Sequence, residues 1–416
     1  MSTSTRLGDA DFWRQPLQAR MDGFAVLREQ EPFTRVELVN PLMIGAGDSF
    51  YAVTRYADIV EISRRADVFC SGRGSISIAD MPEMAMEFFG SFIAMDDPRH
   101  ARLRRIVSQA FTPKRLRAVE ESVDSICSGL IDAMAADGEA DLVSALSAPF
   151  PLMVICEMMG IPRSEFATVL SATNVILGAG DPDMLGGRDP FTGILEAGAT
   201  LVSLVTDLAE QRRKEPTGDL ITALVHGEVE DQRMTLAEIG PFFILLAVAG
   251  NDTTRTATSL GMQLLAENPE QRAVWQADLD GVTATAVEEI VRMASPVVFM
   301  RRTVTEDVTL SGQAFVPGDK LVLFYGAGNR DPRVFTDPDR FDVRRTPNPH
   351  VGFGGPGPHF CLGANLARRE LSIVFRQLLT RLPDIELAGD PVYLEAMGIP
   401  LVGGVKRLPV RFSPAA

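Results

Sequence analysis

The stretch FGGPGPHFCLGANLARRE, residues 353–370, places a single cysteine, Cys361, directly after a run of glycines and prolines. The glycines free the backbone and the prolines stiffen it, so the loop can aim several N–H groups at one sulfur. The residues after it, 362–379, predict a helix whose N-terminal partial charge would favour a thiolate. With no second cysteine nearby, a four-cysteine zinc site is excluded, whereas a lone thiolate among hydrogen-bond donors suits a haem iron. The residues alone leave a second interpretation open, a glycine-rich turn around an inert cysteine.

The composition limits the classes of protein to which the chain can belong. With 416 residues, 46% of them hydrophobic, it is long enough for one large domain or for two or three smaller ones. Its net charge of −15 argues against a nucleic-acid-binding protein, because phosphates would repel it. The N-terminus has no signal-peptide pattern, and the longest strongly apolar run, 241–250, is too short for a membrane helix. We therefore expect a cytoplasmic protein without a membrane anchor, in which Cys70, Cys127 and Cys156 are buried free thiols.

The hydrophobic pattern predicts a mainly α protein with a minor β part. Helical periodicity dominates from Asp96 to about Asp280, and alternating apolar residues after Ser295 predict short strands. We find no internal repeat, no low-complexity linker and no regular exchange of strands and helices that would indicate a parallel sheet. We therefore expect residues 1–416 to form a single domain.

The segment TAVEEIVRMASP, which starts at Thr285, carries helix signals at both ends. Thr285 and Glu288 match a capping box, and Pro296 marks the end of the helix. Glu289 and Arg292 are three residues apart and share one helix face. On spacing alone, this is a surface ion pair worth well under about 1 kcal/mol.

The segment FFILLAVAGNDTTRTATS, residues 242–259, is apolar and then abruptly polar at helical pitch. Gly250 leaves room beside the helix, and Asp252 and Thr253 place an acid and a hydroxyl there. Adjacent threonines disfavour a helix and can bond back to its carbonyls, which predicts a local bulge. A widened, wet groove in a buried helix suits oxygen binding and proton relay. The alternative is a helix end capped by an Asn or Asp side chain.

Four segments, in this order along the chain, resemble motifs of the soluble bacterial cytochromes P450, a family of haem-thiolate monooxygenases: AGNDTT, EEIVR, DPDRF and GPGPHFCLG. The resemblance covers essentially the whole chain, from DDPRHARLRR to the end. It implies a triangular, α-rich prism with haem b buried between the oxygen-activation helix and the cysteine-loop helix. It also implies insertion of one atom of O2 into an unactivated C–H bond of an apolar substrate. The electrons would come from a ferredoxin and its reductase, since no flavin or nicotinamide motif is found.

The cysteine loop is one residue longer than the usual form, so Phe353 lies eight residues before Cys361. Phe353 or Gly354 could therefore take the usual aromatic place beside the haem. The long form resembles a subgroup that hydroxylates branched lipids and sterol side chains, which implies terminal hydroxylation of methyl-branched lipids or cholestenone-type side chains. Hydroxylation of a terpenoid, a steroid nucleus or a secondary metabolite is the alternative, and a non-catalytic haem carrier or gas sensor is a more distant one. The pair Asp252 and Thr253 argues against a peroxide-driven relative.

The resemblance also implies roles for single residues. Cys361 is the axial iron ligand, and Asp252 and Thr253 route protons to dioxygen. Glu289, Arg292 and Arg340 form a buried cluster that supports the cysteine loop. The remaining haem-binding residues, the first four of them holding the propionates, are His100, Arg104, Arg302, His359, Ala249, Gly250, Phe353, Gly354 and Gly363.

Two further groups of residues follow from the resemblance. The segment Val297 to Met300 would face the distal side of the haem, and from it Val298 and Phe299 are expected in the substrate pocket together with Met397. Basic residues near the cysteine side predict a docking patch for an acidic ferredoxin on a monomeric enzyme. These basic residues are Arg99, Arg102, Arg105, Lys114, Arg115, Arg117, Arg368 and Arg369.

Overall fold

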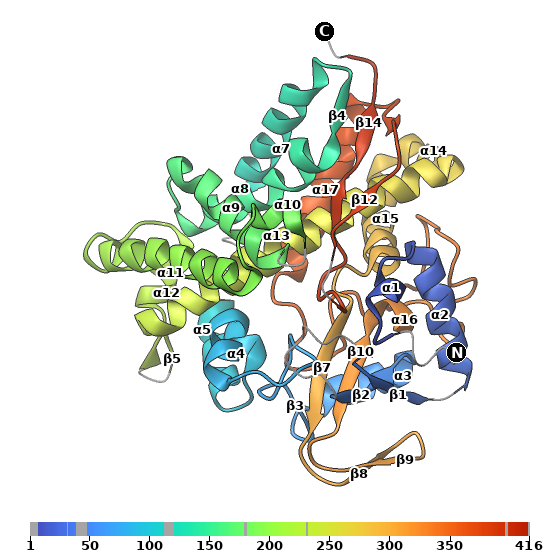
Figure 1. Cartoon of the computed structure of the whole chain (residues 1–416). Coiled ribbons are helices and arrows are strands. Elements are labelled where there is room, and N and C mark those ends of the chain that lie inside the picture. Colours follow the sequence, from blue (N-terminus) through green and yellow to red (C-terminus); the bar gives the residue numbers. More distant parts are fainter. Residues whose placement is uncertain are drawn as a thin grey trace.

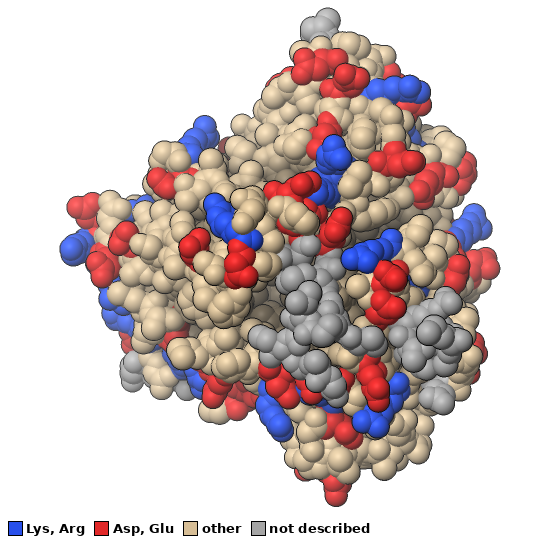
Figure 2. All heavy atoms as spheres, in the orientation of Figure 1, with Lys and Arg blue, Asp and Glu red and all other residues tan. Residues whose placement is uncertain are grey.

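The structure, a computed structural model, describes residues 7–30, 32–38, 48–111, 120–178, 181–229, 232–395 and 398–414. Helices make up most of it, and the main sheet lies at one side, next to the N-terminal helices (Figure 1). The predicted mainly α architecture with a minor β part is confirmed. On the face shown in Figure 2, acidic (red) and basic (blue) side chains are interspersed with one another.

Helix α13 (Leu236–Glu267) is the long central helix against which other helices pack. It begins with a capping box, in which Thr235 and Glu238 exchange hydrogen bonds between side chains and backbone. The predicted bulge near Gly250 is wrong, because α13 is continuously α-helical there. The helices that contact it most extensively are α4 (Glu83–Gly90), α8 (Pro149–Met159), α11 (Pro190–Lys214), α15 (Leu279–Ala294) and α17 (Ala364–Arg381).

The other helices in the described part of the chain are shorter or more peripheral. They are α1 (Ala10–Trp13), α2 (Leu17–Gln30), α3 (Tyr56–Arg64), α5 (Arg99–Ala110), α7 (Glu120–Ala135), α9 (Phe166–Leu177), α10 (Pro182–Leu185), α12 (Leu220–His226), α14 (Pro269–Ala277) and α16 (Tyr325–Gly328). Single helical turns of other types are η2 (Ser91–Ala94), η3 (Val143–Ser147) and η4 (Arg163–Glu165).

The main sheet has the strand order β1-β2-β10-β7-β3, in which only β2 and β10 pair in parallel. Its strands are β1 (Phe33–Glu37), β2 (Ser49–Val53), β3 (Phe69–Cys70), β7 (Phe299–Val304) and β10 (Lys320–Phe324). The smaller sheets use β4 (Glu139–Asp141), β5 (Glu228–Val229), β6 (Gln232–Arg233), β8 (Val308–Leu310), β9 (Gln313–Phe315), β11 (Glu386–Leu387), β12 (Val392–Tyr393), β13 (Val405–Arg407) and β14 (Pro409–Arg411). Strand β7 bears most directly on function, because it contains several of the predicted site residues. Successive side chains of a strand point to opposite faces of the sheet, so neighbours in β7 face different surroundings.

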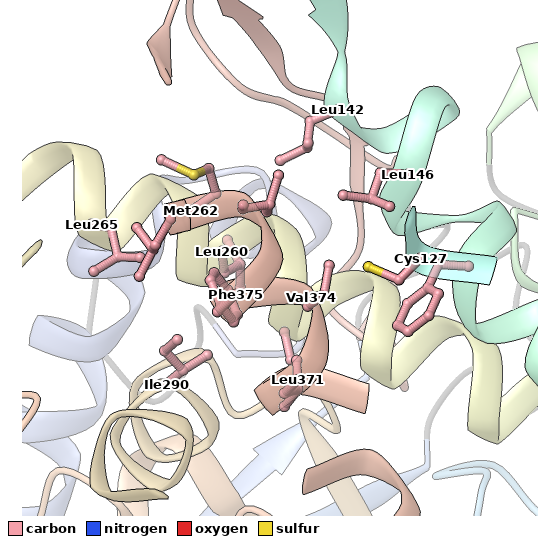
Figure 3. Packing of buried hydrophobic residues seen from close by; sticks show 14 of the residues in the cluster. Cys127, Leu142, Leu146, Leu260, Met262, Leu265, Ile290, Leu371, Val374 and Phe375 are labelled. Carbon is pink, nitrogen blue, oxygen red and sulfur yellow. The ribbon is translucent and has the colours of Figure 1, made fainter. Parts of the chain in front are cut away.

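The largest described apolar core fixes α17, the helix that follows the cysteine loop, against α13, α15 and α7 (Figure 3). Phe375 and Val374 of α17 are fully buried in it. At Gly261 of α13, a Cβ atom would lie 2.5 Å from Phe375 Cζ, so glycine allows the two helices to approach closely. This packing sets the position of the cysteine loop relative to α13.

Helix α15 begins earlier than its sequence signals indicate. Its N-cap is Asp278, whose carboxylate accepts a hydrogen bond from the N–H of Gly281 at 2.9 Å. The predicted capping box at Thr285 is therefore wrong. The Thr285 hydroxyl instead bonds to backbone carbonyls, including that of Val343 at 2.6 Å. The helix ends at Ala294, just before Pro296, as predicted.

Two helices, α11 and α13, are long and apolar enough to cross a membrane by length and composition alone. Half of the apolar window of α13 is buried inside the structure. The central helix of a folded domain passes the same test, so these two helices are weak evidence for a membrane span.

Candidate active site

A large, mostly apolar cavity lies between α13 and the cysteine loop. It contains about 1430 Å³ of empty space, including its opening to solvent. Most of the predicted haem-binding residues line it: Arg104, Ala249, Gly250, Arg302, Phe353, Gly354, His359, Cys361 and Gly363. Residues 249 and 361 face the same cavity although they are more than a hundred positions apart in the chain, because α17 packs against α13.

The cysteine loop is held in a tight, closed turn. The N–H of Cys361 donates to the carbonyl of Phe353 at 3.0 Å. Gly354 has φ +88°, which favours glycine, and a Cβ at Gly357 would lie 2.1 Å from the carbonyl oxygen of Ser63. The glycines therefore let the loop fold back on itself and pack against α3.

Burial raises the pKa of the Cys361 thiol. The N–H of Gly363 and the cations Arg104 and Arg368 oppose this rise but do not overcome it. Without a bound metal, burial therefore outweighs the stabilisation of the thiolate that is expected from the helix N-terminus. A positive partner inside the cavity, such as a metal ion, would favour the thiolate form of Cys361.

Arg104 and Arg302 gather at one edge of the cavity, where neither pairs with a carboxylate of the residues that the structure describes. Arg302 is 5% exposed, and it forms no ion pair among the described residues. Its neighbour Arg301 points to the other face of β7 and pairs with Asp80 at 2.7 Å. Arg104 reaches the cysteine loop, where it donates to the carbonyl of Phe360 at 2.5 Å. This edge of the cavity therefore suits an anionic group.

Two histidines lie at this edge, of which His359 lines the cavity and His100, which does not, packs against His359. The rings of His100 and His359 lie 4.1 Å apart, and neither His100 Nε2 nor His359 Nδ1 has a partner among the described residues. His100 is held by Asp97 at 3.2 Å, and His359 contacts Ser71 at 3.1 Å. Burial, with nearby Arg302, lowers the pKa of His359 to about 2. Buried polar atoms without partners beside unpaired arginines fit the two propionates of a haem, and the apolar cavity fits its ring.

Thr253 and Asp252 occupy different sides of α13. Thr253 lines the cavity, and its hydroxyl donates to the carbonyl of Ala249 at 2.7 Å. Asp252 is 4% exposed, does not line the cavity, and its Oδ2 atom has no partner among the described residues. Burial raises the pKa of Asp252 to about 8, although Arg255 opposes the rise. Asp252 thus keeps a proton at neutral pH, next to the cavity rather than inside it.

A second buried carboxyl group was missed from the sequence. Glu370 of α17 lines the cavity and accepts a hydrogen bond from the Thr254 hydroxyl of α13 at 3.1 Å. It is 2% exposed, and burial raises its pKa to about 8. The available signal was its position between Leu366 and Val374, each four residues away on the apolar face of α17.

The buried cluster near the cysteine loop contains a different second arginine from the one predicted. Glu289 and Arg292 form a bidentate pair at 2.7 and 2.8 Å, and both side chains are fully buried, so the surface-pair interpretation is wrong. Arg345 then binds Glu289 at 3.1 Å, whereas the side chain of Arg340 is exposed. The assignment of Arg340 is therefore corrected to Arg345. Arg340 contributes its carbonyl oxygen, which accepts from Arg292 at 3.1 Å.

The predicted substrate-pocket residues are mostly placed elsewhere. Phe299 is buried in the core against Phe324, and Val298 lines a smaller, separate cavity, so both assignments are wrong. Val297 and Met300 line the main cavity instead. Met397 lies outside the described residues. Apolar residues that also line the main cavity are Phe92, Ile93, Phe111, Ile155, Phe242, Leu245 and Leu246.

Comparison with known proteins agrees with this geometry. Residues 197–383 match the family described as Cytochrome P450. The chain is 46% identical to the methyl-branched lipid omega-hydroxylase of Mycobacterium tuberculosis, over 98% of this chain and 94% of the relative. It is 35% identical to the steroid C26-monooxygenase of Mycolicibacterium smegmatis, over 100% and 96% of the two chains.

A solved structure is also similar along the whole chain. It is a Mycobacterium marinum cytochrome P450 in complex with pseudoionone, with a TM-score of 0.91, 41% identity and coverage of 97% of both chains. The chain therefore belongs to the cytochrome P450 family of monooxygenases, which use O2 at a haem bound through a cysteine thiolate to oxidise apolar substrates.

Proposed function

We propose that this monooxygenase hydroxylates the terminal carbon of methyl-branched lipids or of cholestenone-type side chains. The observation that carries the proposal is the 46% identity, along nearly the whole chain, to a methyl-branched lipid omega-hydroxylase. The steroid C26-monooxygenase relative supports the same class of chemistry, oxidation at the end of a branched chain. The mostly apolar lining of the cavity supports a hydrocarbon substrate.

We assign the haem contacts as follows. Cys361 would bind the haem iron through its sulfur, and the peptide turn closed by Phe353 would keep that sulfur in place. Arg104, Arg302 and the two histidines would hold the propionates through charge-assisted hydrogen bonds. Ala249 and Gly250 leave space beside α13 for substrate and dioxygen. When bound, the haem supplies the oxygen-insertion chemistry.

Proton delivery uses groups on two sides of α13. The protonated carboxyl group of Asp252 stores a proton next to the cavity, because its pKa of about 8 keeps it neutral at physiological pH. The hydroxyl of Thr253 lines the cavity and passes protons through water to the reacting oxygen. For this step, Thr253 has to release its hydrogen bond to the carbonyl of Ala249.

The choice of substrate is tested by spectral titration of the haem-loaded enzyme. We would add a methyl-branched fatty acid, its straight-chain counterpart, a cholestenone and a monoterpenol, and follow the Soret band. Low-to-high-spin conversion with the branched acid or the sterone, and terminal alcohols as the main products by mass spectrometry, would support the proposal. Mainly subterminal alcohols, or a response to the terpenol alone, would refute it.

A second candidate is hydroxylation of a branched terpenoid. It is favoured by the likeness to the Mycobacterium marinum cytochrome P450 that was solved in complex with pseudoionone. Pseudoionone is therefore added to the titration. Tight binding and turnover of pseudoionone, with none for the branched acid or the sterone, would establish this alternative.

The role of Cys361 has its own test. Cys361→Ser should abolish the thiolate signature of the ferrous–CO spectrum. Cys156→Ser is the matched control, because Cys156 is a free, fully buried core cysteine that does not line the cavity. An unchanged spectrum in Cys361→Ser would place the iron ligand elsewhere.

We further propose that the enzyme acts as a monomeric, cytoplasmic, single-domain protein that receives electrons from a ferredoxin. The basic patch predicted to bind the ferredoxin is partly neutralised, because Arg99 pairs with Glu87 and Arg102 pairs with Glu238. Lys114, Arg115 and Arg117 lie outside the described residues.

Charge reversal tests this patch. Arg105→Glu should slow reduction by ferredoxin at low salt and have less effect at high salt, because salt screens steering between exposed charges. Arg14→Glu, at the exposed C-cap of α1, is the control variant. Equal reduction rates for wild type and Arg105→Glu at low salt would remove Arg105 from the docking surface.

A further inference from the structure

Glu288 of α15 links two groups that belong to the cysteine-loop region. Arg368 of α17 donates to it from Nε at 2.6 Å and from Nη2 at 3.0 Å, a bidentate geometry. His350 lies 3.0 Å from it through Nε2. His350 Nδ1 accepts the N–H of Gly352 at 3.1 Å, so Nε2 carries the proton and donates to the carboxylate. Burial raises the pKa of Glu288, but these two donors outweigh it and lower the pKa to about 2.

The guanidinium of Arg368 lies on the ring of Phe353. Its Cζ atom is 4.4 Å from the ring centroid, a cation–π contact, and the ring of His350 is 5.8 Å away on a tilted plane. A planar guanidinium can make two hydrogen bonds to a carboxylate and still cover a ring, which a lysine ammonium cannot do. Phe353 is thus held by Arg368 and His350, which both bind the carboxylate of Glu288.

Phe353 in turn closes the loop around the sulfur. Its carbonyl accepts the N–H of Cys361 at 3.0 Å, and the sulfur receives the backbone N–H of Gly363. Through this bond the position of Phe353 helps to fix the backbone of Cys361, which carries the sulfur. Hydrogen bonds to a ligand sulfur, and charges near it, set the reduction potential of the metal that it binds.

We propose that Glu288, Arg368 and His350 form a positioning clamp that fixes Phe353 and thereby helps to set the midpoint potential of the haem. The proposal rests on Cys361 being the axial ligand, as assigned above. None of the three clamp residues donates a described hydrogen bond to the sulfur. Arg368 also places a positive charge near the sulfur, so Arg368→Lys, which keeps that charge, isolates the effect that passes through Phe353. The clamp joins α15 and α17 to the loop between them, and loosening it would weaken the hydrogen bond from Gly363 to the sulfur.

The test compares two ion pairs that join the same two helices. Arg368→Lys keeps the positive charge but loses the planar guanidinium that covers the Phe353 ring, and Arg368→Met loses both the charge and the plane. The control is Arg376→Lys, because Arg376 of α17 pairs with Asp280 of α15 at 2.8 Å, and Asp280 is 91% exposed. Midpoint potentials are measured by spectroelectrochemical titration with chemical mediators, so that no redox partner takes part.

Arg368→Lys should shift the potential downward, since a less hydrogen-bonded thiolate donates more charge to the iron and favours the oxidised state. Arg368→Met should shift it further, and Arg376→Lys should leave it at the wild-type value. In a Glu288→Gln background, Arg368→Lys should have little additional effect, because the clamp is already broken. A wild-type potential in Arg368→Lys, or an equal shift in Arg376→Lys, would overturn the proposal.

The ferrous–CO spectrum separates this proposal from the assignment of Cys361. Each variant should keep a thiolate-type spectrum while its potential changes. Loss of the wild-type thiolate signature in Cys361→Ser, together with unshifted potentials in the Arg368 variants, would reject the clamp and keep the axial ligand. If Arg368→Met does not fold, Arg368→Lys alone carries the test.

Discussion

The corrected arginine of the buried cluster gives a sharp prediction, namely that Arg345→Met is far more damaging than Arg340→Met. The side chain of Arg345 is 10% exposed and makes four hydrogen bonds, to a carboxylate oxygen of Glu289 at 3.1 Å and to the carbonyls of Thr336, Asp337 and Arg340 at 2.8, 3.1 and 2.9 Å. At about 1 kcal/mol net for each bond, their loss costs about 4 kcal/mol. This agrees with the roughly 3–5 kcal/mol expected when a buried ion pair loses one partner.

Arg340→Met should lower the free energy of unfolding by about 0.5 kcal/mol or less, because the Arg340 side chain is exposed. The variant also retains the backbone carbonyl that accepts hydrogen bonds from Arg292 and Arg345. The assay is urea-induced unfolding of both variants, followed by far-UV circular dichroism, with haem retention measured on the same samples. Equal losses of stability in the two variants, or a loss below about 1 kcal/mol in Arg345→Met, would refute the reasoning.

Three further predictions concern the cavity. The neutral form of Glu370 stabilises the native state fully below pH 4.5, and this stabilisation is lost as the pH rises through about 8. The free energy of unfolding should therefore fall by about 1.4 kcal/mol per pH unit across that interval. Glu370→Gln should flatten this fall in urea titrations. Gly250→Val should lower the free energy of unfolding by about 1 kcal/mol in urea titrations, because a Cβ there would lie 2.7 Å from Ile155 Cδ1 and overpack the contact between α13 and α8. Arg302→Met should lower haem retention with little effect on unfolding of the apoprotein, whereas Arg301→Met should destabilise the apoprotein by breaking its pair with Asp80.

The local motifs could be interpreted from the sequence because each is a continuous segment. The glycines and prolines before Cys361, the helix after it, and the change from apolar to polar residues at Gly250 all act over a few neighbouring residues. The spacing of Glu289 and Arg292 likewise placed both side chains on one helix face before any tertiary contact was known. These segments were sufficient to indicate the family and the mainly α fold.

The tertiary structure decided which of several equivalent residues takes each place. Arg340 and Arg345 lie in an irregular loop without periodicity, so only its path shows which arginine reaches Glu289. In β7, alternation predicts that neighbours face opposite ways, but only pairing with β10 decides that Met300 faces the cavity and Phe299 the core.

Burial likewise depends on distant segments. The sequence placed Cys361 at a helix N-terminus, which favours a thiolate, but the packing of the loop removes water from the sulfur and raises its pKa. Glu370 has no special feature in the sequence of its helix. Its burial and its hydrogen bond from Thr254 arise only because α13 packs over it. The sequence by itself determined the local conformations and the chemistry available, whereas the tertiary structure determined which charges lose water and which partners replace it, because desolvation depends on surfaces contributed by residues far apart in the chain.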